Sequence, residues 1–178
     1  MGTGKDIPVL VVSGSTGVGK STLLAAIHEV LAARDVPHGC IDADALSYAW
    51  PMRGAFNRVT MLENVGAVWA NFQRAGAACL VFAGVIEHAS DLEDLRGVIP
   101  GARMTVCQLV ASEAIRRARL QTREIGAALE WHLHRTVELQ RIIDAEALHD
   151  FAVNNDDRAV RDVAIEILEQ AHWSPTVA

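Results

Sequence analysis

The residues best suited to chemistry form a glycine-rich stretch near the start of the chain. Residues 14–21 match the pattern G-x-x-x-x-G-K-[ST] at every defined position. Glycines let successive backbone N–H groups face one hollow, which binds phosphate oxygens at the positive end of the following helix. Lys20 can then reach the outer phosphates, and the Ser21 hydroxyl can ligate magnesium. The expected phosphate-binding residues are Gly14, Ser15, Thr16, Gly17, Val18, Gly19, Lys20, Ser21 and Thr22.

Two aspartates, Asp42 and Asp44, follow a short strand-like segment at residues 38–42. A carboxylate at the rim of a phosphate site can orient an acceptor hydroxyl and take its proton. If the strand continues through Asp44, both side chains lie on the same side of it. We then expect Asp44 to act as the base and Asp42 to bind magnesium together with Ser21. The alternative is a pair of turn-forming aspartates at a strand end.

Positive charge is also needed around a transferring phosphoryl group. Ser112 is a typical helix N-cap, and the helix it predicts carries Arg119 and Arg123 on one face. These two arginines can close over a nucleotide as a clamp, and Arg116 or Arg117 can take either place. The alternative is a solvated arginine stripe.

Composition limits the classes of function. With 178 residues and 51% hydrophobic side chains, the chain suits one domain with one core. The formal charge of −6 argues against a broad basic face for nucleic acid. No apolar run is long enough to cross a bilayer, and no signal-peptide core is present, so we expect a cytoplasmic protein without a membrane partner. We expect loose chain ends at residues 2–5 and 174–176.

The cysteines and histidines show no metal-binding spacing. Cys40, Cys79 and Cys107 each lie in an apolar, strand-like segment, without C-x-x-C spacing or nearby histidine partners. We expect small buried hydrophobic residues in a reducing compartment. His132 and His134 lie two apart in an expected helix, which directs them to different faces.

The elements that must position these residues alternate along the chain. Apolar strand-like runs occur near residues 9–12, 38–42, 77–83, 104–109 and 151–153. Helical patterns occupy about 20–34, 57–74, part of 87–97, 112–125, 129–148 and a segment capped by Asp157. Five strands separated by helices predict an α/β fold with a parallel sheet covered on both faces. Ligands then bind at the carboxyl ends of the strands.

These features resemble the small P-loop kinases of the nucleoside-monophosphate-kinase type. The nearest branch contains adenylylsulfate kinase, chloramphenicol phosphotransferase, shikimate kinase and gluconate kinase. The resemblance rests on the phosphate loop, on Asp42 and Asp44, on Arg119-x-x-x-Arg123, and on residues 62–65, Leu-Glu-Asn-Val, which are similar to the Glu-Asn-Ile of adenylylsulfate kinases. It implies a P-loop NTPase three-layer α/β/α sandwich with a five-stranded parallel sheet in the order 2-3-1-4-5. The single domain covers residues 1–178, with a short helical lid around 112–130.

The resemblance further implies ATP with Mg²⁺ and phosphoryl transfer to a hydroxyl of a small molecule. The sequence differs from the resembling kinases at two places, which bear on the substrate and on the magnesium site. The Lys-Ala-Arg run in the lid of adenylylsulfate kinases is missing after Arg123, so we expect a different substrate. The third strand ends in Phe82-Ala83-Gly84 without the acidic residue that many P-loop proteins place near magnesium, which leaves Asp42 or Asp44 for that role.

The acceptor side carries charges of both signs. Arg53 and Arg58 lie in the segment that covers the acceptor in the resembling kinases, which suits an anionic group. An acidic patch of Glu87, Asp91, Glu93 and Asp94 follows the third strand and favours a cationic acceptor, such as an aminosugar antibiotic, if it faces the cleft; the alternative is a solvated helix face. Tyr48 and Trp50 can stack on an acceptor ring or seal the core. The expected substrate-binding residues are Asp44, Arg53, Arg58, Asn64 and Glu87.

The sequence thus predicts an ATP-dependent phosphotransferase that acts on a small polar molecule, an antibiotic or another secondary metabolite. The expected catalytic residues are Lys20, Asp42, Asp44, Arg119 and Arg123. Alternatives within the class are adenylylsulfate, nucleoside or nucleotide kinases, and we expect a monomer or homodimer. A GTPase switch is less consistent with the sequence: its D-x-x-G match at residues 94–97 lies past the strand tip, and Asn155 replaces the lysine of N-K-x-D. A nucleotide-binding regulatory module without chemistry is the remaining alternative.

Overall fold

A five-stranded parallel sheet forms the centre of the computed structural model, which describes residues 6–173. The strands are β1 (Ile7–Ser13), β2 (His38–Asp42), β3 (Cys79–Ala83), β4 (Ala102–Val110) and β5 (Phe151–Asn154). They are arranged in the order β2-β3-β1-β4-β5, and every neighbouring pair is parallel. The predicted fold class and strand order are therefore confirmed. The expected loose ends at residues 2–5 and 174–176 lie outside the described residues.

The central strands consist mainly of continuous apolar residues, which favours a position in the middle of the sheet. All five residues of β3 are buried, and so are six of the seven residues of β1. A strand with both of its faces buried needs helices on both sides, and a parallel sheet supplies this arrangement through its crossover helices. Val11 of β1 lies opposite Phe82 of β3 and Val106 of β4 in the register of the sheet.

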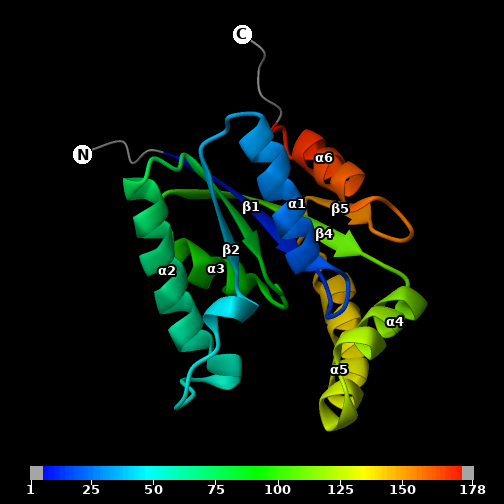
Figure 1. The fold of residues 1–178 in the computed structure, drawn as a ribbon. Coiled ribbons are helices and arrows are strands. Elements are labelled where there is room, and N and C mark those ends of the chain that lie inside the picture. The colour runs from blue at the N-terminus through cyan, green and yellow to red at the C-terminus, as the bar shows by residue number, and fades with distance from the viewer. Residues whose placement is uncertain (1–5, 174–178) are drawn as a thin grey trace.

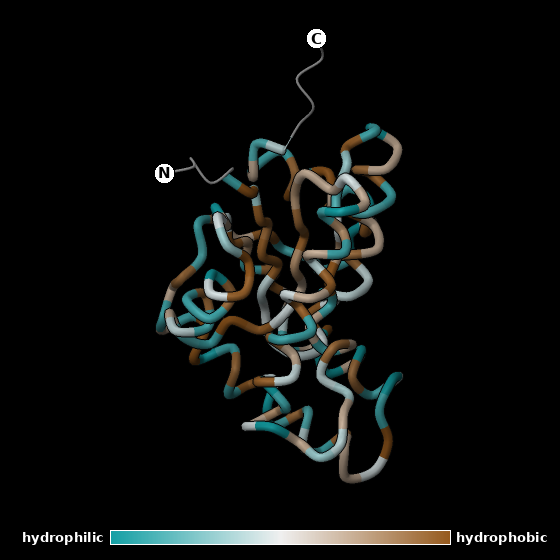
Figure 2. Tube along the Cα trace, turned by 90° about the vertical axis from the view of Figure 1, so that its left-hand side faces the viewer, coloured by the Kyte–Doolittle hydropathy of each residue, from teal (hydrophilic) through white to brown (hydrophobic). Residues whose placement is uncertain are grey.

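Helices cover both faces of the sheet (Figure 1). One face is covered by α1 (Lys20–Ala33) and α6 (Val160–Gln170), which share a core that includes Ile27 and Ile167. The opposite face is covered by α2 (Arg58–Arg74) and α3 (Ala89–Val98), whose core includes Trp69 and Leu95. Figure 2 shows hydrophobic residues concentrated along the strands between these layers.

Two helices extend beyond the carboxyl ends of the strands, where the sequence predicts a lid (Figure 1). They are α4 (Glu113–Arg123) and α5 (Gly126–Glu146). The Ser112 hydroxyl accepts a hydrogen bond from the backbone N–H of Ile115 at 3.4 Å, so this predicted N-cap is confirmed. Gly126 has a φ of 61° and separates the two helices, as expected, but α5 begins at that residue, three residues before the expected start.

Two local predictions differ from the structure. The chain leaves β2 at Asp42 and enters a short 3₁₀ turn, η1 (Asp44–Leu46), followed by a second, η2 (Ala55–Asn57). The strand therefore does not continue through Asp44. Asp157 has a φ of 47° and does not cap α6, whose N-cap is Ala159 without a side-chain hydrogen bond.

Across residues 6–173, every helix is too short or too polar to span a lipid bilayer.

Candidate active site

The phosphate loop (residues 14–21) joins β1 to α1 at the carboxyl edge of the sheet. Gly14 has a φ of 154°, and a Cβ on it would come within 2.5 Å of the carbonyl oxygen of Leu109. Gly19 has a φ of 104° and forms the N-cap of α1 in the left-handed region. A Cβ there would lie 2.9 Å from the side-chain amide of Asn155. Glycine is thus required at both positions by the backbone and by close packing.

Lys20 is folded over this loop. Its ammonium donates to the carbonyl oxygens of Gly14 at 2.8 Å and Ser15 at 3.2 Å. Burial lowers the pKa of Lys20 to about 8, while the charges of Asp44 and Asp42 favour the protonated form and Arg123 opposes it. The charges of these three side chains therefore act on the same ammonium group. Arg119, the fifth expected catalytic residue, contacts the loop directly through the carbonyl oxygen of Val18.

The two aspartates differ in their surroundings. One oxygen of Asp42, Oδ1, accepts a hydrogen bond from the backbone N–H of Asp44 at 3.0 Å. Asp42 therefore makes the turn that ends β2, as the turn-forming alternative required, and keeps its second oxygen for other contacts. The Asp44 side chain is exposed, and within residues 6–173 no hydrogen bond or ion pair engages its carboxylate. This turn, and not a continued strand, sets the relative positions of the two residues.

The phosphate loop is braced by residues far away in the sequence. The Ser15 hydroxyl donates to Oε1 of Gln140 at 3.0 Å, and the Thr136 hydroxyl donates to the carbonyl oxygen of Thr16 at 2.7 Å. Both partners lie on α5. The side-chain amide of Asn155, after β5, donates to the carbonyl oxygen of Val18 at 2.8 Å. A fixed loop presents its N–H groups without reorganisation when phosphate binds.

The arginines of α4 have different roles. Arg119 donates to the carbonyl oxygens of Val18 at 2.8 Å and Asn155 at 3.0 Å, so it connects the loop to the segment after β5. Arg116 is buried and donates to the backbone of Ala111 and to Gln140. Arg123 remains more than half exposed and bonds only to the adjacent Glu124 among the described residues. A solvated stripe does not describe this helix, because two of its arginines are engaged in the site.

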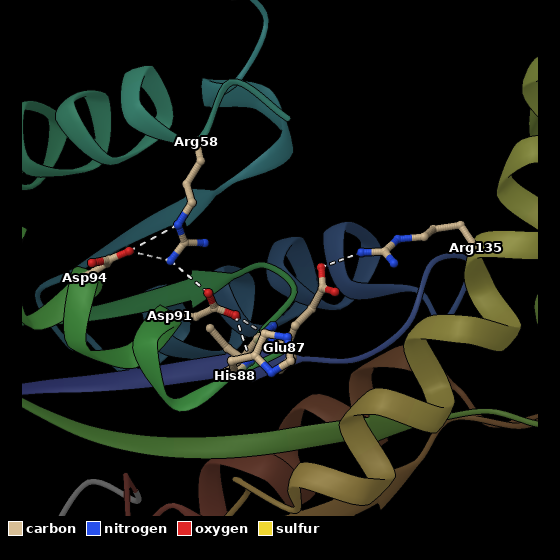
Figure 3. Close-up of polar contacts among 8 residues, drawn as sticks. Arg58, Glu87, His88, Asp91, Asp94 and Arg135 are labelled. Carbon is tan, nitrogen blue, oxygen red and sulfur yellow. Dashed lines mark hydrogen bonds and ion pairs between the residues drawn. The ribbon is translucent and has the colours of Figure 1, made fainter. Parts of the chain in front are cut away.

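The charges on the acceptor side are paired with one another (Figure 3). Arg58 at the start of α2 donates to Asp94 at 2.8 Å and lies 2.9 Å from Asp91, both on α3. Asp91 also accepts from the backbone N–H groups of Glu87 at 2.6 Å and of His88 at 3.0 Å, which caps α3. The expectation of a free acidic patch facing the cleft is therefore not met for Asp91 and Asp94.

Two further ion pairs complete this side. Glu87, in the loop between β3 and α3, pairs with Arg135 of α5 at 2.6 Å (Figure 3). Arg53 pairs with Glu63 on α2 through both of its terminal nitrogens. The positive charge expected from Arg53 and Arg58 for an anionic acceptor is thus already matched by carboxylates.

The segment that runs from the end of η1 through η2 is held in place by the buried Asn57 and displays several apolar side chains. Asn57 donates to the carbonyl oxygens of Ser47 at 2.8 Å and Ala49 at 3.1 Å, and accepts from the N–H of Arg53 at 2.8 Å. Asn64 supports the same segment by donating to the carbonyl oxygen of Leu46 at 2.9 Å. Large apolar side chains remain exposed here: Tyr48, Trp50, Met52 and Phe56. The interpretation that Tyr48 and Trp50 seal the core is therefore wrong.

Phe56 faces α5 from this segment. Its ring centroid lies 6.0 Å from that of Trp131, and the guanidinium carbon of Arg135 lies 5.6 Å from the centroid. Phe56 and Asn57 both have positive φ, 52° and 56°. A bulky residue rarely adopts this conformation, and such strain concentrates at functional sites.

Comparisons with known proteins find no match among protein-family models or curated protein sequences, but solved structures do match. A gluconokinase from Sinorhizobium meliloti 1021 aligns with 93% of this chain and 92% of its own, at a TM-score of 0.65 and 20% identity. The tunicamycin resistance protein of Deinococcus radiodurans aligns at 92% and 95%, with a TM-score of 0.63 and 15% identity. An APS kinase from Mycobacterium tuberculosis aligns at 95% and 99%, with a TM-score of 0.63 and 16% identity. The chain has the P-loop kinase fold.

Within this P-loop kinase fold, the residues expected to hold magnesium have suitable donor atoms. The Ser21 hydroxyl is exposed in the first turn of α1, and Asp42 keeps one carboxylate oxygen outside its turn. Hydroxyl and carboxylate oxygens are the ligands that Mg²⁺ prefers.

The motifs that suggested a GTPase serve other purposes in the structure. Asp94 pairs with Arg58 of α2, and Asn155 bonds to the phosphate loop. Neither takes the position of a guanine-reading or switch residue.

The sequence-based interpretation missed four residues that shape the site: Gln140, Thr136, Asn155 and Arg135. The α5 residues at 136 and 140 lie four apart, a spacing that places them on one helix face. That spacing was the only signal available, and it does not by itself distinguish a site from a polar surface.

Proposed function

We propose that the protein is an ATP-dependent phosphotransferase that moves the γ-phosphoryl group of ATP to a hydroxyl of a small molecule. The observation that carries this proposal is the phosphate loop itself, with Lys20 folded over it, Arg119 bonded to it, and the exposed Asp44, whose charge acts on the Lys20 ammonium. A passive nucleotide-binding module needs the loop and its lysine. It does not need an exposed carboxylate beside them.

Each of these residues has a separate role in the transfer. The loop N–H groups and Lys20 hold the phosphates, and Arg123 meets the charge that spreads over the transferring group. The acceptor oxygen forms a bond to the γ-phosphorus as the bond to the β–γ bridging oxygen breaks, ADP leaves, and Asp44 takes the hydroxyl proton. Ser21 and Asp42 would hold magnesium, which supplies charge neutralisation between the phosphates.

The acceptor-side contacts support a neutral molecule with a flat apolar part. Among residues 6–173, Arg53, Arg58 and Arg135 each have a carboxylate partner, so little positive charge is left for an anion such as gluconate, shikimate or APS. The pairing of Asp91 and Asp94 also removes the reason to expect a cationic aminosugar. Phe56 and Trp131 offer aromatic faces on which a ring can stack.

An antibiotic or another secondary metabolite that carries a ring and a free hydroxyl fits this description. The name of the Deinococcus radiodurans tunicamycin resistance protein, a protein with the same fold, is consistent with such an acceptor. Adenylylsulfate and nucleotide acceptors gain less support, because their phosphate groups need the cations that are paired here.

The test is a turnover assay with Mg²⁺-ATP and a panel of acceptors. The panel contains neutral ring-bearing alcohols, nucleosides, aminosugars, gluconate, shikimate and adenylylsulfate, and it measures ADP release and the mass of the phosphorylated product. We expect transfer to a neutral ring-bearing alcohol, and at least a hundredfold loss of turnover in Lys20→Ala. Turnover that is fastest with an anionic acceptor contradicts the acceptor class. A folded Lys20→Ala protein with wild-type turnover contradicts the kinase.

A further inference from the structure

A cluster of two histidines and one cysteine lies outside the nucleotide site, between α1 and β2. It consists of His28 on α1 and of His38 and Cys40 on β2. His38 and Cys40 are two residues apart in a strand, so both side chains point to the same face of the sheet. That face is the one covered by α1, because Cys40 packs against the core that α1 and α6 share. The potential ligand atoms of the three side chains all lie within 4.8 Å of one another.

The orientation of the His38 ring is fixed by the backbone. Its Nδ1 lies 2.6 Å from the carbonyl oxygen of Val36, and a carbonyl can only accept, so Nδ1 carries the proton. The lone pair of His38 is therefore on Nε2, which lies 2.8 Å from Nδ1 of His28. A hydrogen bond from one ring nitrogen to a backbone carbonyl is the contact that orients metal-ligating histidines in proteins.

We infer that His28 Nδ1, His38 Nε2 and Cys40 Sγ form a binding site for a zinc-class divalent cation. Three protein ligands with water as the fourth give the tetrahedral coordination that Zn²⁺ prefers. Imidazole and thiolate ligands also select zinc over magnesium, which binds hard oxygen ligands. When the cation binds, the Cys40 thiol gives up its proton to solvent, and the proton on Nδ1 of His28 moves to its Nε2, which frees the Nδ1 lone pair.

The two histidine nitrogens need only a small adjustment for coordination. Two Zn–N bonds of about 2.0 Å at a tetrahedral angle place the nitrogens about 3.3 Å apart. The histidine nitrogens, now 2.8 Å apart, must therefore separate by about half an ångström. His28 is exposed, so its side chain can turn without disturbing the core.

This site is separate from the proposed magnesium site. Along the extended strand β2, Asp42 lies about 13 Å from His38 and about 7 Å from Cys40, too far for one ion to bind both sets of ligands. A cation held here connects α1, the helix that begins at Lys20, to the edge strand β2. Binding to the native state alone raises the apparent stability of the fold.

The test is a zinc titration of the full chain against a competing chelating dye, without nucleotide. We expect one tightly bound zinc per chain, and affinity at least about tenfold weaker in His28→Ala, His38→Ala and Cys40→Ser. Two controls should keep wild-type affinity: His134→Ala removes another exposed histidine, and Asp42→Asn alters the proposed magnesium site. Circular dichroism verifies that each variant is folded.

Cobalt provides an independent readout of the cysteine ligand. Bound to the wild type, Co²⁺ should give the near-ultraviolet charge-transfer absorption of a cobalt–thiolate bond, and Cys40→Ser should abolish it. The proposal is overturned if zinc affinity is the same in the wild type and in His38→Ala, or if no cobalt–thiolate band forms. None of these measurements depends on phosphoryl transfer, so their failure leaves the proposed kinase function standing.

Discussion

The Ser15 hydroxyl donates a 3.0 Å hydrogen bond to Oε1 of Gln140, which joins the phosphate loop to the middle of α5. The same oxygen accepts from the buried Arg116 at 3.1 Å, and the amide nitrogen of Gln140 donates to Asp144 at 2.8 Å. Asp144 in turn accepts from Gln108 of β4 at 3.0 Å. The network connects the loop, both lid helices and the sheet through one side chain.

Gln140→Ala should therefore lower both stability and nucleotide affinity. The change leaves Ser15 and Arg116 without their shared acceptor, and an unsatisfied buried donor costs about 1–3 kcal/mol. Denaturant unfolding and titration with a non-hydrolysable ATP analogue measure the two effects. Gln170→Ala is the matched control, because Gln170 makes one exposed hydrogen bond to Glu166 on α6 and should change stability by less than about 0.5 kcal/mol. Equal results for the two variants would contradict a bracing role.

The pKa of Lys20 predicts how activity depends on pH. Burial lowers this pKa to about 8, so the free enzyme loses the ammonium charge as the pH rises past that value. Since kcat/KM reports the free enzyme, kcat/KM for Mg²⁺-ATP should fall above about pH 8. In contrast, kcat should fall only at higher pH, because bound phosphates stabilise the ammonium. Lys20→Arg keeps its charge throughout this range and should remove the alkaline decline of kcat/KM. An identical decline in both proteins would assign it to another group.

Arg119 and Arg123 should give different phenotypes, although they lie four residues apart on one helix. Arg119→Ala removes two hydrogen bonds to the backbone of the loop and of Asn155, so it should lower stability as well as raise the KM for ATP. Arg123→Ala removes an exposed side chain, so stability should stay within about 0.5 kcal/mol of the wild type. Its kcat should fall about tenfold or more if it meets the transferring phosphoryl group.

The control for both arginines is Arg103→Ala on the exposed start of β4. Thermal unfolding and steady-state kinetics on the three variants separate the roles. Wild-type kinetics in Arg123→Ala would remove it from the clamp.

The aromatic pair Phe56–Trp131 should affect the acceptor and not the nucleotide. Phe56→Ala and Trp131→Ala remove a stacking face, so each should raise the KM of a ring-bearing acceptor about tenfold and leave the KM of ATP unchanged. Trp50→Ala is the control, because Trp50 is also an exposed aromatic residue and lies outside the pair. If all three variants raise the acceptor KM equally, the Phe56–Trp131 pair has no special role in binding the acceptor.

The sequence predicted the parts of the site that depend on local pattern. The glycines of the phosphate loop, its lysine and the five apolar strands have fixed spacings, and the strand order followed from the resemblance to P-loop kinases. The lid helices were also predicted, with the break at Gly126.

Contacts between distant segments could not be predicted in the same way. The pairing of Arg58 with Asp94 and of Glu87 with Arg135 depends on which helix faces are brought together, and single-sequence patterns do not contain that information. The expectation that Cys40 has no histidine neighbour was wrong, and only the contribution of His28 depends on contacts between distant segments. His38 is two residues away on the same face of β2, and the packing of α1 adds His28.

Substitutions of the two aspartates after β2 distinguish phosphoryl transfer from nucleotide binding alone. Asp44 is exposed and its charge acts on Lys20, whereas one oxygen of Asp42 is engaged in the turn. Asp44→Asn keeps the size of the side chain but cannot take the proton of the acceptor hydroxyl. We therefore expect turnover to fall by about a hundredfold or more, with little change in nucleotide affinity.

Asp42→Asn should instead raise the Mg²⁺ concentration needed for half-maximal turnover, because the amide is a weaker ligand than the carboxylate. It should leave the turn intact, since the amide oxygen can still accept from the N–H of Asp44. Steady-state kinetics at varied Mg²⁺ on both variants distinguish these roles. Unchanged turnover in Asp44→Asn would exclude it as the base. Unchanged turnover and magnesium dependence in both variants would mean that the pair only turns the chain, and the transfer would then rest on Lys20 and Arg123.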